Sequence, residues 1–235
     1  MSDWKPKRFW THSAVVKVDG GHTVELDGRR VKTPAKQALI LPTEAMAKEI
    51  AAEWDAQEKE VDPATMPYTR SANAAIDKVR TQHGEVAEML SDYGDSDLLC
   101  YRATHPKALQ DRQVAEWDPV LDWAAETLSA RLVPVSGVLH KPQSKDALVR
   151  LRERVHGMDA FQLAAFHDLV SLSGSLILGF AAALNWREPD EIWRISRLDE
   201  DWQIEQWGHD YEAHAAAETK KAAFLHAKSF FDLSF

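Results

Sequence analysis

Apolar and polar residues alternate along the first forty residues, which is the pattern of strands with one buried face. Residues 14–18 and 23–26 form two such runs around Gly20-Gly21, and this glycine pair supplies the positive φ angles of a tight hairpin. Asp27-Gly28 is a second turn signal. Further short strands are expected at Val31 and at residues 38–41. The start of the chain is therefore predicted to form a small antiparallel meander.

The spacing of apolar residues then changes from two to four. Thr43 has the side chain of a helix N-cap, and Met46, Ile50 and Trp54 follow at four-residue intervals. This spacing predicts a helix with one apolar face. Residues 61–68 contain two prolines and are expected to form a loop that leads to a second domain.

The rest of the chain has a helical pattern. Asp118-Pro119 is expected to break the stretch 106–129, because the residue before a proline avoids the α region. Residues 143–156 are amphipathic, and Gly157 is suited to end that helix. Residues 189–231 are helical in pattern, strongly charged and rich in tryptophan.

Residues 169–184 form the most apolar run of the chain. The run is interrupted by three serines and is shorter than the ~20 residues that span a bilayer, so we expect a buried helix, capped by Asp159. Ser175, Gly179 and Ala183 recur at four-residue spacing within it. Such a ridge of small residues lets a neighbouring helix approach closely.

These patterns predict an α+β protein. A small β-rich N-terminal domain with one helix is expected at residues 1–68, and a larger all-helical domain at residues 69–235.

The charge of the chain argues against two classes of partner. It has 28 Lys and Arg against 37 Asp and Glu, a net charge of −9. Nucleic acids and anionic lipids are bound through clustered basic residues, and the sequence has no basic stripe. We therefore expect no nucleic-acid partner and no membrane insertion. The single cysteine, Cys100, cannot form an internal disulfide, which favours a reducing compartment.

The first ten residues lack the apolar core of a secretory leader. This start favours the bacterial cytoplasm, or the mitochondrial matrix for a processed eukaryotic form.

Enzyme signatures are missing from the sequence. It contains no phosphate-binding loop, no dinucleotide fingerprint and no nucleophile elbow. Cys100 is flanked by large apolar residues and is expected to be a buried structural cysteine. We expect no cofactor, no metal and no catalytic residues.

Two clusters in the C-terminal segment weigh against that expectation. Asp210 and His214 are four residues apart and could bind a metal ion together, although a third ligand is not evident. Asp201, Glu205 and His209 form a row that could perform acid–base chemistry if desolvated. Exposed charge rows on helices are much commoner, so we favour a solvated face in both cases.

The chain has nine tryptophans. Trp54 and Trp123 are expected in the core. Trp193, Trp202 and Trp207 lie among Asp and Glu in the terminal helices, and an apolar anchor ringed by charge is typical of a binding hot spot. Half-buried packing residues are an equally good interpretation of these three.

Several short motifs also occur in a specific order and spacing along most of the chain. They are Arg8-Phe9-Trp10, Leu26-Asp27-Gly28-Arg29 before Thr33-Pro34, Glu53-Trp54-Asp55, Thr65-Met66-Pro67, Ala75-Ile76-Asp77, Asp97-Leu98-Leu99-Cys100-Tyr101-Arg102, Trp117-Asp118-Pro119, Gly174-Ser175-Leu176, Leu198-Asp199-Glu200, Gln203 and Trp207-Gly208. With them the sequence resembles the family of assembly chaperones for the catalytic F(1) head of ATP synthase, in the branch that holds the free alpha subunit.

This resemblance implies a β-rich N-terminal part, a helical C-terminal part and a chaperone that is not an enzyme. Such a protein binds the unassembled alpha subunit and prevents its aggregation, without ATP hydrolysis, until a beta subunit displaces it. Glu200 fits the family's functional carboxylate, with a helix cap or an intramolecular ion pair as the alternative. The client-binding residues that we expect are Glu200, Trp202, Gln203, Trp207 and Asp210.

Two other functions remain open at this point. One is a metal-assisted hydrolase that uses the Asp210/His214 region, and the other is a scaffold for a different complex.

Overall fold

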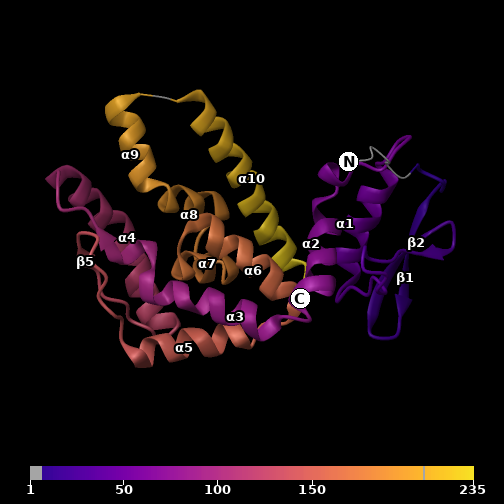
Figure 1. Cartoon of the computed structure of the whole chain (residues 1–235), viewed down its shortest axis with the longest axis horizontal. Coiled ribbons are helices and arrows are strands. Elements are labelled where there is room, and N and C mark those ends of the chain that lie inside the picture. Colours follow the sequence, from indigo (N-terminus) through magenta and orange to yellow (C-terminus); the bar gives the residue numbers. More distant parts are fainter. Residues whose placement is uncertain (1–6, 209) are drawn as a thin grey trace. The chain divides into compact units, whose positions relative to one another are not determined.

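The computed structural model describes residues 7–208 and 210–235 (Figure 1). Strands β1 (Ser13–Val18), β2 (Gly21–Leu26) and β3 (Arg29–Arg30) form an antiparallel sheet in the order β1-β2-β3. Strands β4 (Tyr101–Arg102) and β5 (Val135–Ser136) form a short parallel pair. Helices make up most of the remaining chain, so the predicted α+β class is confirmed.

The helices follow one another in short segments. They are α1 (Glu44–Asp55), α2 (Pro67–Ala74), α3 (His83–Ser91), α4 (Lys107–Thr127), α5 (Lys145–His156), α6 (Ala160–Ser173), α7 (Leu176–Ala183), α8 (Pro189–Ser196), α9 (Leu198–Trp207) and α10 (Tyr211–Asp232). The described residues also form four short helical segments. They are the 3-10 helices η1 (Pro63–Thr65), η3 (Asp92–Ser96) and η4 (Leu98–Cys100) and the π-helix η2 (Ala75–Val79). None of the described helices is both long and apolar enough to cross a bilayer.

The chain forms two compact units. Unit 1 comprises residues 1–83, 159–164 and 229–235, and unit 2 comprises residues 84–158 and 165–228. The sequence pattern placed a boundary after residue 68, where strands give way to helices. The two units are defined by packing, whereas the predicted boundary is defined by secondary structure. The units therefore do not test the boundary, which stays a prediction. Unit 2 holds 23 of the 37 Asp and Glu residues and 15 of the 28 Lys and Arg residues, so it carries most of the net negative charge.

The hairpin of unit 1 turns one residue earlier than the glycine pair suggested. Val18 pairs with Gly21, so the two-residue turn is Asp19-Gly20, and Gly21 is the first residue of β2. Gly21 has a φ of +148°, and a Cβ atom there would lie 2.2 Å from the carbonyl oxygen of Leu41. Glycine is required at this position by the close approach of a neighbouring backbone.

Helix α1 begins as predicted. The hydroxyl of Thr43 accepts a hydrogen bond from the Met46 N–H at 3.1 Å, and Met46 and Ile50 are fully buried. Trp54, the third residue of the predicted apolar face, is only partly buried, and Trp123 of unit 2 is partly buried against Trp186 as well. These two tryptophans, expected in the core, each lie at the edge of a core and pack there against another tryptophan.

The loop predicted at residues 61–68 is shorter than expected. Pro67 and Tyr68 already belong to α2, since proline is well suited to the first turn of a helix. The buried carboxylate of Glu53 accepts hydrogen bonds from the N–H groups of Tyr68 and Thr69, at 2.6 and 2.7 Å, and from the Thr69 hydroxyl. Burial raises the pKa of Glu53 despite these donors. A side chain from α1 thus caps α2.

In unit 2, helix α4 continues through Pro119, contrary to the predicted break. Proline removes one N–H from the helical ladder, and tertiary contacts on either side offset that loss. Trp117 is fully buried and donates from Nε1 to the Ile195 carbonyl at 3.0 Å. Arg102 donates to the Asp118 carboxylate at 2.7 Å.

The apolar run 169–184 forms two helices where one was predicted. Gly174 adopts a φ of +70° and ends α6, and Ser175 caps α7 by accepting from the Leu178 N–H at 3.0 Å. Ser175 is therefore not part of a helical ridge. Gly179 does permit close packing, since a Cβ atom there would lie 2.6 Å from the Val170 side chain.

Asp97 connects this α6–α7 turn to η4. Its side chain is fully buried, and it accepts from the Leu99 N–H and the Ile177 N–H, both at 3.0 Å. Burial raises the pKa of Asp97 to about 6, well above its ordinary value. The neighbouring Cys100 is buried as predicted, and burial with the charge of Asp97 raises its pKa to about 12.

We expect the Asp97→Ala substitution to lower the free energy of unfolding by about 3 kcal/mol, because two buried N–H groups lose their acceptor. Urea denaturation followed by circular dichroism measures the effect. The control is Asp111→Ala, which removes an exposed carboxylate and should change stability by less than about 0.5 kcal/mol. Equal effects of the two substitutions would contradict the role of Asp97.

The raised pKa of Asp97 also predicts a pH dependence. As the pH falls from 7 to 5, the folded protein binds a proton at Asp97 while the unfolded chain does not, so lower pH favours the folded state. The stability difference between the wild type and Asp97→Ala should grow by about 1 kcal/mol over this interval. Urea titrations at both pH values test this, and a constant or shrinking difference would refute it.

Candidate functional site

The C-terminal helices of unit 2 enclose an open groove of about 790 Å³. Helices α8, α9 and α10 line it, and Figure 1 shows α9 and α10 as separate arms. We call it the α9–α10 groove. Its apolar surface comes from Trp193, Ile204, Trp207, Ala213 and Ala217.

Local sequence sets the ends of the two arms. Helix α9 ends at Trp207 because Gly208 adopts a φ of +90°, a conformation that disfavours other residues. The carboxylate of Asp210 accepts from the N–H groups of Glu212 and Ala213, at 2.8 and 3.2 Å, and so caps the start of α10.

The structure brings four of the five predicted client-binding residues into this groove. Glu200, Gln203, Trp207 and Asp210 all line it. Trp202 does not, because it lies on another face of α9, where the Arg112 guanidinium is 6.0 Å from its ring centre.

The three tryptophans of the terminal helices therefore have three different environments. Trp193 is buried and contacts Phe224, with ring centres 5.6 Å apart, so it forms part of the groove floor. Trp202 is partly buried. Trp207 is 80% exposed on the groove wall, and Tyr211 nearby in sequence is 88% exposed. Trp207 has the exposure expected of an unoccupied binding anchor.

Acidic side chains dominate the rest of the groove lining. Its six carboxylates are Asp190, Glu200, Asp201, Glu205, Asp210 and Glu218. The three Lys and Arg residues that line it all pair with acids: Arg197 with Glu200 at 2.7 Å, Lys221 with Asp190 at 2.7 Å and Arg194 with Glu116 at 3.0 Å. In the described part of the chain, Asp201 and Glu218 form no ion pair. The groove therefore has excess negative charge.

The Arg197 pair gives Glu200 the intramolecular contact that was the alternative to a functional role. The Glu200 side chain nevertheless remains 46% exposed, and the contact uses one of its two carboxylate oxygens. No described residue donates a hydrogen bond to the second oxygen, which can therefore accept one from another molecule.

Glu205 fixes α9 against α4. Both of its oxygens accept from the Arg112 guanidinium, at 2.7 and 2.9 Å, and this lowers the pKa of Glu205 and raises that of Arg112. Arg112 thus holds both Glu205 and Trp202 from outside the groove.

The two clusters that suggested enzyme chemistry gain no support. Asp210 serves as a helix cap, and no group of three or more His, Cys, Asp or Glu side chains among the described residues could hold a metal ion. His209 lies outside the described residues. Glu205 is already bound to Arg112, so the row Asp201, Glu205 and His209 offers no desolvated base at that position.

Sequence reasoning missed Ala213, Ala217, Arg197 and Lys221, which also line the groove. Ala213 and Ala217 are four residues apart in a charged helix, and this small-residue pair was the available signal.

We expect the Arg112→Ala substitution to loosen α9 selectively. It removes two charge-assisted hydrogen bonds to Glu205, but both side chains are substantially exposed, so global stability should fall by less than about 1 kcal/mol. Amide hydrogen exchange in α9 should accelerate. The control is Lys107→Ala, whose ion pair with Asp111 lies within α4 and should leave exchange in α9 unchanged. Unchanged exchange in α9 of Arg112→Ala would contradict the tether.

Comparison with known proteins agrees with the family resemblance of the sequence. A family described as "ATP12 chaperone protein" matches residues 7–125. The mitochondrial protein atp12 of Schizosaccharomyces pombe is 28% identical over 222 residues, which cover 88% of this chain and 76% of that protein.

Solved structures match this chain over nearly its whole length. The crystal structure of Atp12 from Paracoccus denitrificans matches with a TM-score of 0.96 and 47% identity, covering 99% of this chain and all of that one. A protein of Agrobacterium tumefaciens, solved as a candidate chaperone, matches with a TM-score of 0.92 and 40% identity, covering 97% of this chain and 86% of that one.

Proposed function

Since the chain belongs to the ATP12 family and is an assembly chaperone of ATP synthase, we propose that it binds the unassembled F(1) alpha subunit through the α9–α10 groove. Binding there would cover an assembly surface of the alpha subunit and prevent its aggregation. A subunit of a multisubunit ring exposes large apolar interfaces before it assembles, and such surfaces aggregate.

The observation that supports this site is the exposed Trp207 among carboxylates. Burial of a tryptophan side chain is favourable, and Trp207 is 80% exposed, so this stabilisation is gained only when a partner covers it. The surrounding excess of negative charge favours a client segment that carries Lys or Arg beside an apolar residue. Glu200 would accept a hydrogen bond from such a residue through its second oxygen, which orients the client.

We further propose that the activity needs no catalysis and no ATP. Support comes from the sequence, which contains no phosphate-binding loop, and from the fact that binding alone suffices to protect a surface. Release would follow by mass action, when a beta subunit competes for the same face of the client. The setting we propose is the bacterial cytoplasm, or the mitochondrial matrix for a processed eukaryotic form, as in the S. pombe relative named mitochondrial.

Mixing the protein with isolated alpha subunit should give a complex on size-exclusion chromatography and suppress light scattering by the alpha subunit, equally with and without ATP. No phosphate should be released from ATP. Binding of a different lysate complex, with no affinity for the alpha subunit, would instead indicate the scaffold alternative. Suppression that requires ATP hydrolysis would contradict the passive mechanism.

We expect Trp207→Ala and Glu200→Lys each to weaken alpha-subunit binding by about tenfold or more, because one removes an apolar anchor and the other reverses a charge in the groove. Trp207→Ala should change the unfolding free energy by less than about 0.5 kcal/mol, because the side chain is 80% exposed. Glu200→Lys also breaks the ion pair with Arg197 and should cost about 1 kcal/mol, so its binding is measured at a temperature where thermal unfolding shows it folded. Isothermal titration calorimetry measures the affinity.

Matched controls exist elsewhere on the chain. Phe235→Ala removes an aromatic ring that is 75% exposed, and Glu153→Lys reverses an exposed charge on α5, both outside the groove. These controls should bind the alpha subunit like the wild type. If all four variants bind equally, the groove is not the client site.

A further inference from the structure

Unit 1 contains a separate hollow of about 390 Å³ beside α2, which we call the α2 pocket. Its wall is largely apolar and is assembled from the segment after β3, from α1, from the segment before η1, from η1 itself and from α2. The apolar wall residues are Pro34, Trp54, Val61, Pro63, Met66 and Ala74. A cavity of this size and composition is large enough for a bulky apolar side chain and adjoining backbone.

Two polar atoms in the side chains that form this wall have no hydrogen-bond partner among the described residues. They are the indole N–H of Trp54 and the side-chain oxygen of Asn73, and both are shielded from solvent. A buried donor and a buried acceptor without partners are costly, and in native proteins such atoms are rare. Small rotations of these side chains toward the pocket would let a ligand that offers both an acceptor and a donor satisfy them.

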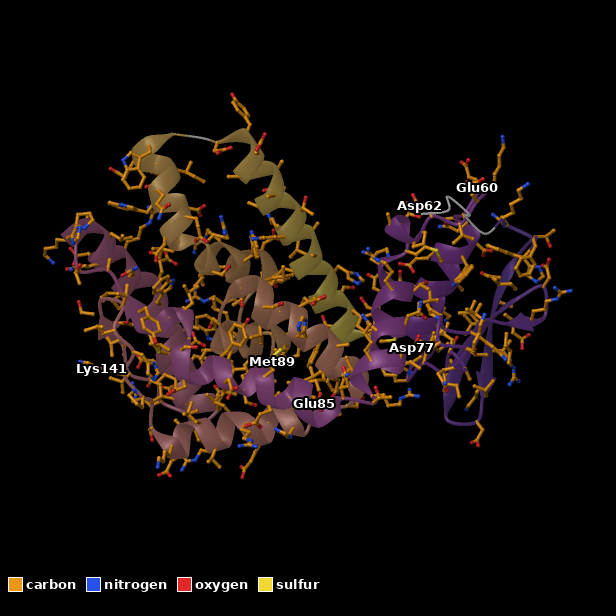
Figure 2. All side chains as sticks on the ribbon, in the orientation of Figure 1. Glu60, Asp62, Asp77, Glu85, Met89 and Lys141 are labelled. Carbon is orange, nitrogen blue, oxygen red and sulfur yellow. The ribbon has the colours of Figure 1, made fainter. Side chains whose placement is uncertain are left out.

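The rim of the pocket has free positive charge. Arg70 and Lys78 are exposed, and in the described part of the chain neither forms an ion pair. The acid between them, Asp77 (labelled in Figure 2), is already used: it accepts from the Thr33 hydroxyl at 2.6 Å and from the Ala35 N–H at 3.0 Å.

Glu53, the acid that acts electrostatically on Arg70, is buried below the rim. Its two carboxylate oxygens are taken by the N–H groups of Tyr68 and Thr69 and by the Thr69 hydroxyl. Hydrogen bonds from neutral donors do not cancel the charge of a carboxylate, so Asp77 offsets part of the positive charge of the rim. Among the described residues, however, neither Asp77 nor Glu53 forms an ion pair with Arg70 or Lys78, so these two cations can pair with a ligand.

We propose that the α2 pocket binds an extended peptide segment in which a bulky apolar residue is followed by acidic residues. The apolar side chain would fill the hollow, and the carboxylates would meet Arg70 and Lys78. A peptide backbone supplies both a C=O for the Trp54 N–H and an N–H for the Asn73 oxygen. A fatty acid has a similar apolar and anionic character but offers no donor, so it satisfies only one of the two orphaned atoms.

This site is distinct from the α9–α10 groove in both unit and charge. The groove has excess carboxylates and favours a basic segment, whereas the α2 pocket has free cations and favours an acidic one. The protein would then bind two segments of opposite charge.

The test uses the full chain and two fluorescein-labelled probes, Gly-Ser-Phe-Asp-Glu-Gly and Gly-Ser-Phe-Lys-Lys-Gly, with binding followed by fluorescence anisotropy. The assay uses the Trp207→Ala variant, which lacks the apolar anchor of the groove and keeps the α2 pocket intact. The acidic probe should bind this variant about tenfold more tightly than the basic probe does. In ¹H–¹⁵N spectra, the indole cross-peak assigned to Trp54 should move downfield on addition of the acidic probe.

Two variants of the pocket and one control complete the design. The double charge reversal Arg70→Glu with Lys78→Glu should invert the probe preference, and Ala74→Leu should weaken both probes by occupying the hollow. Lys17→Glu with Lys59→Glu makes the same change in net charge at exposed positions outside the pocket and should preserve the preference. Thermal unfolding of each variant confirms that it folds.

The proposal is overturned if the acidic probe fails to bind at about 1 mM, if the control reversal changes its affinity as much as the rim reversal does, or if palmitate binds and the acidic probe does not. The alpha-subunit affinities of Trp207→Ala and Glu200→Lys test the groove separately, so failure of the α2 pocket would leave the proposed function intact.

Discussion

The fold of unit 2 depends on the buried carboxylate of Asp97, which forms no ion pair with any described residue. Asp97 accepts two backbone N–H groups from segments about eighty residues apart, one in η4 and one in the first turn of α7. This arrangement fixes where α7 starts, and α7 packs against both α4 and α8. Helix α8 in turn contributes Trp193 to the groove floor. The position of the candidate site is thus set by an interaction in the centre of the unit, whose free energy depends on the protonation of one side chain.

Local patterns in the sequence predicted which helices and strands form more accurately than where each of them ends. Thr43 and Asp159 were correctly expected to cap helices, because a short polar side chain before an apolar period is a strong local signal. The break at Gly174 was missed because the apolar run continues through it, and hydrophobic period alone does not show a change in helix direction. At Pro119 the error was the opposite one, because a break was predicted where the helix continues. The buried Trp117 and the Arg102–Asp118 ion pair stabilise α4 on the N-terminal side of this proline.

The motifs that carry the family resemblance are largely structural. The Arg8 guanidinium donates to the backbone carbonyls of Trp10, Asp55 and Gln57, Asp27 accepts from Thr11, and Glu53 caps α2. These contacts explain why the resemblance predicted the fold well.

The site was predicted less completely. Glu200, Gln203 and Trp207 share one helix face at spacings of three and seven, so they were found together, whereas Trp202 projects elsewhere. Ala213, Ala217 and Lys221 lie across the groove on another helix, and only tertiary structure brings them into it.

The uneven distribution of charge between the units has a kinetic consequence. Carboxylates outnumber cations in unit 2 by 23 to 15, and in unit 1 the two are nearly balanced. The field of unit 2 reaches over a Debye length of about 8 Å at physiological ionic strength, so a cationic surface is drawn toward it before any contact forms. Added salt would therefore slow capture of such a surface much more than it shortens the lifetime of the captured state.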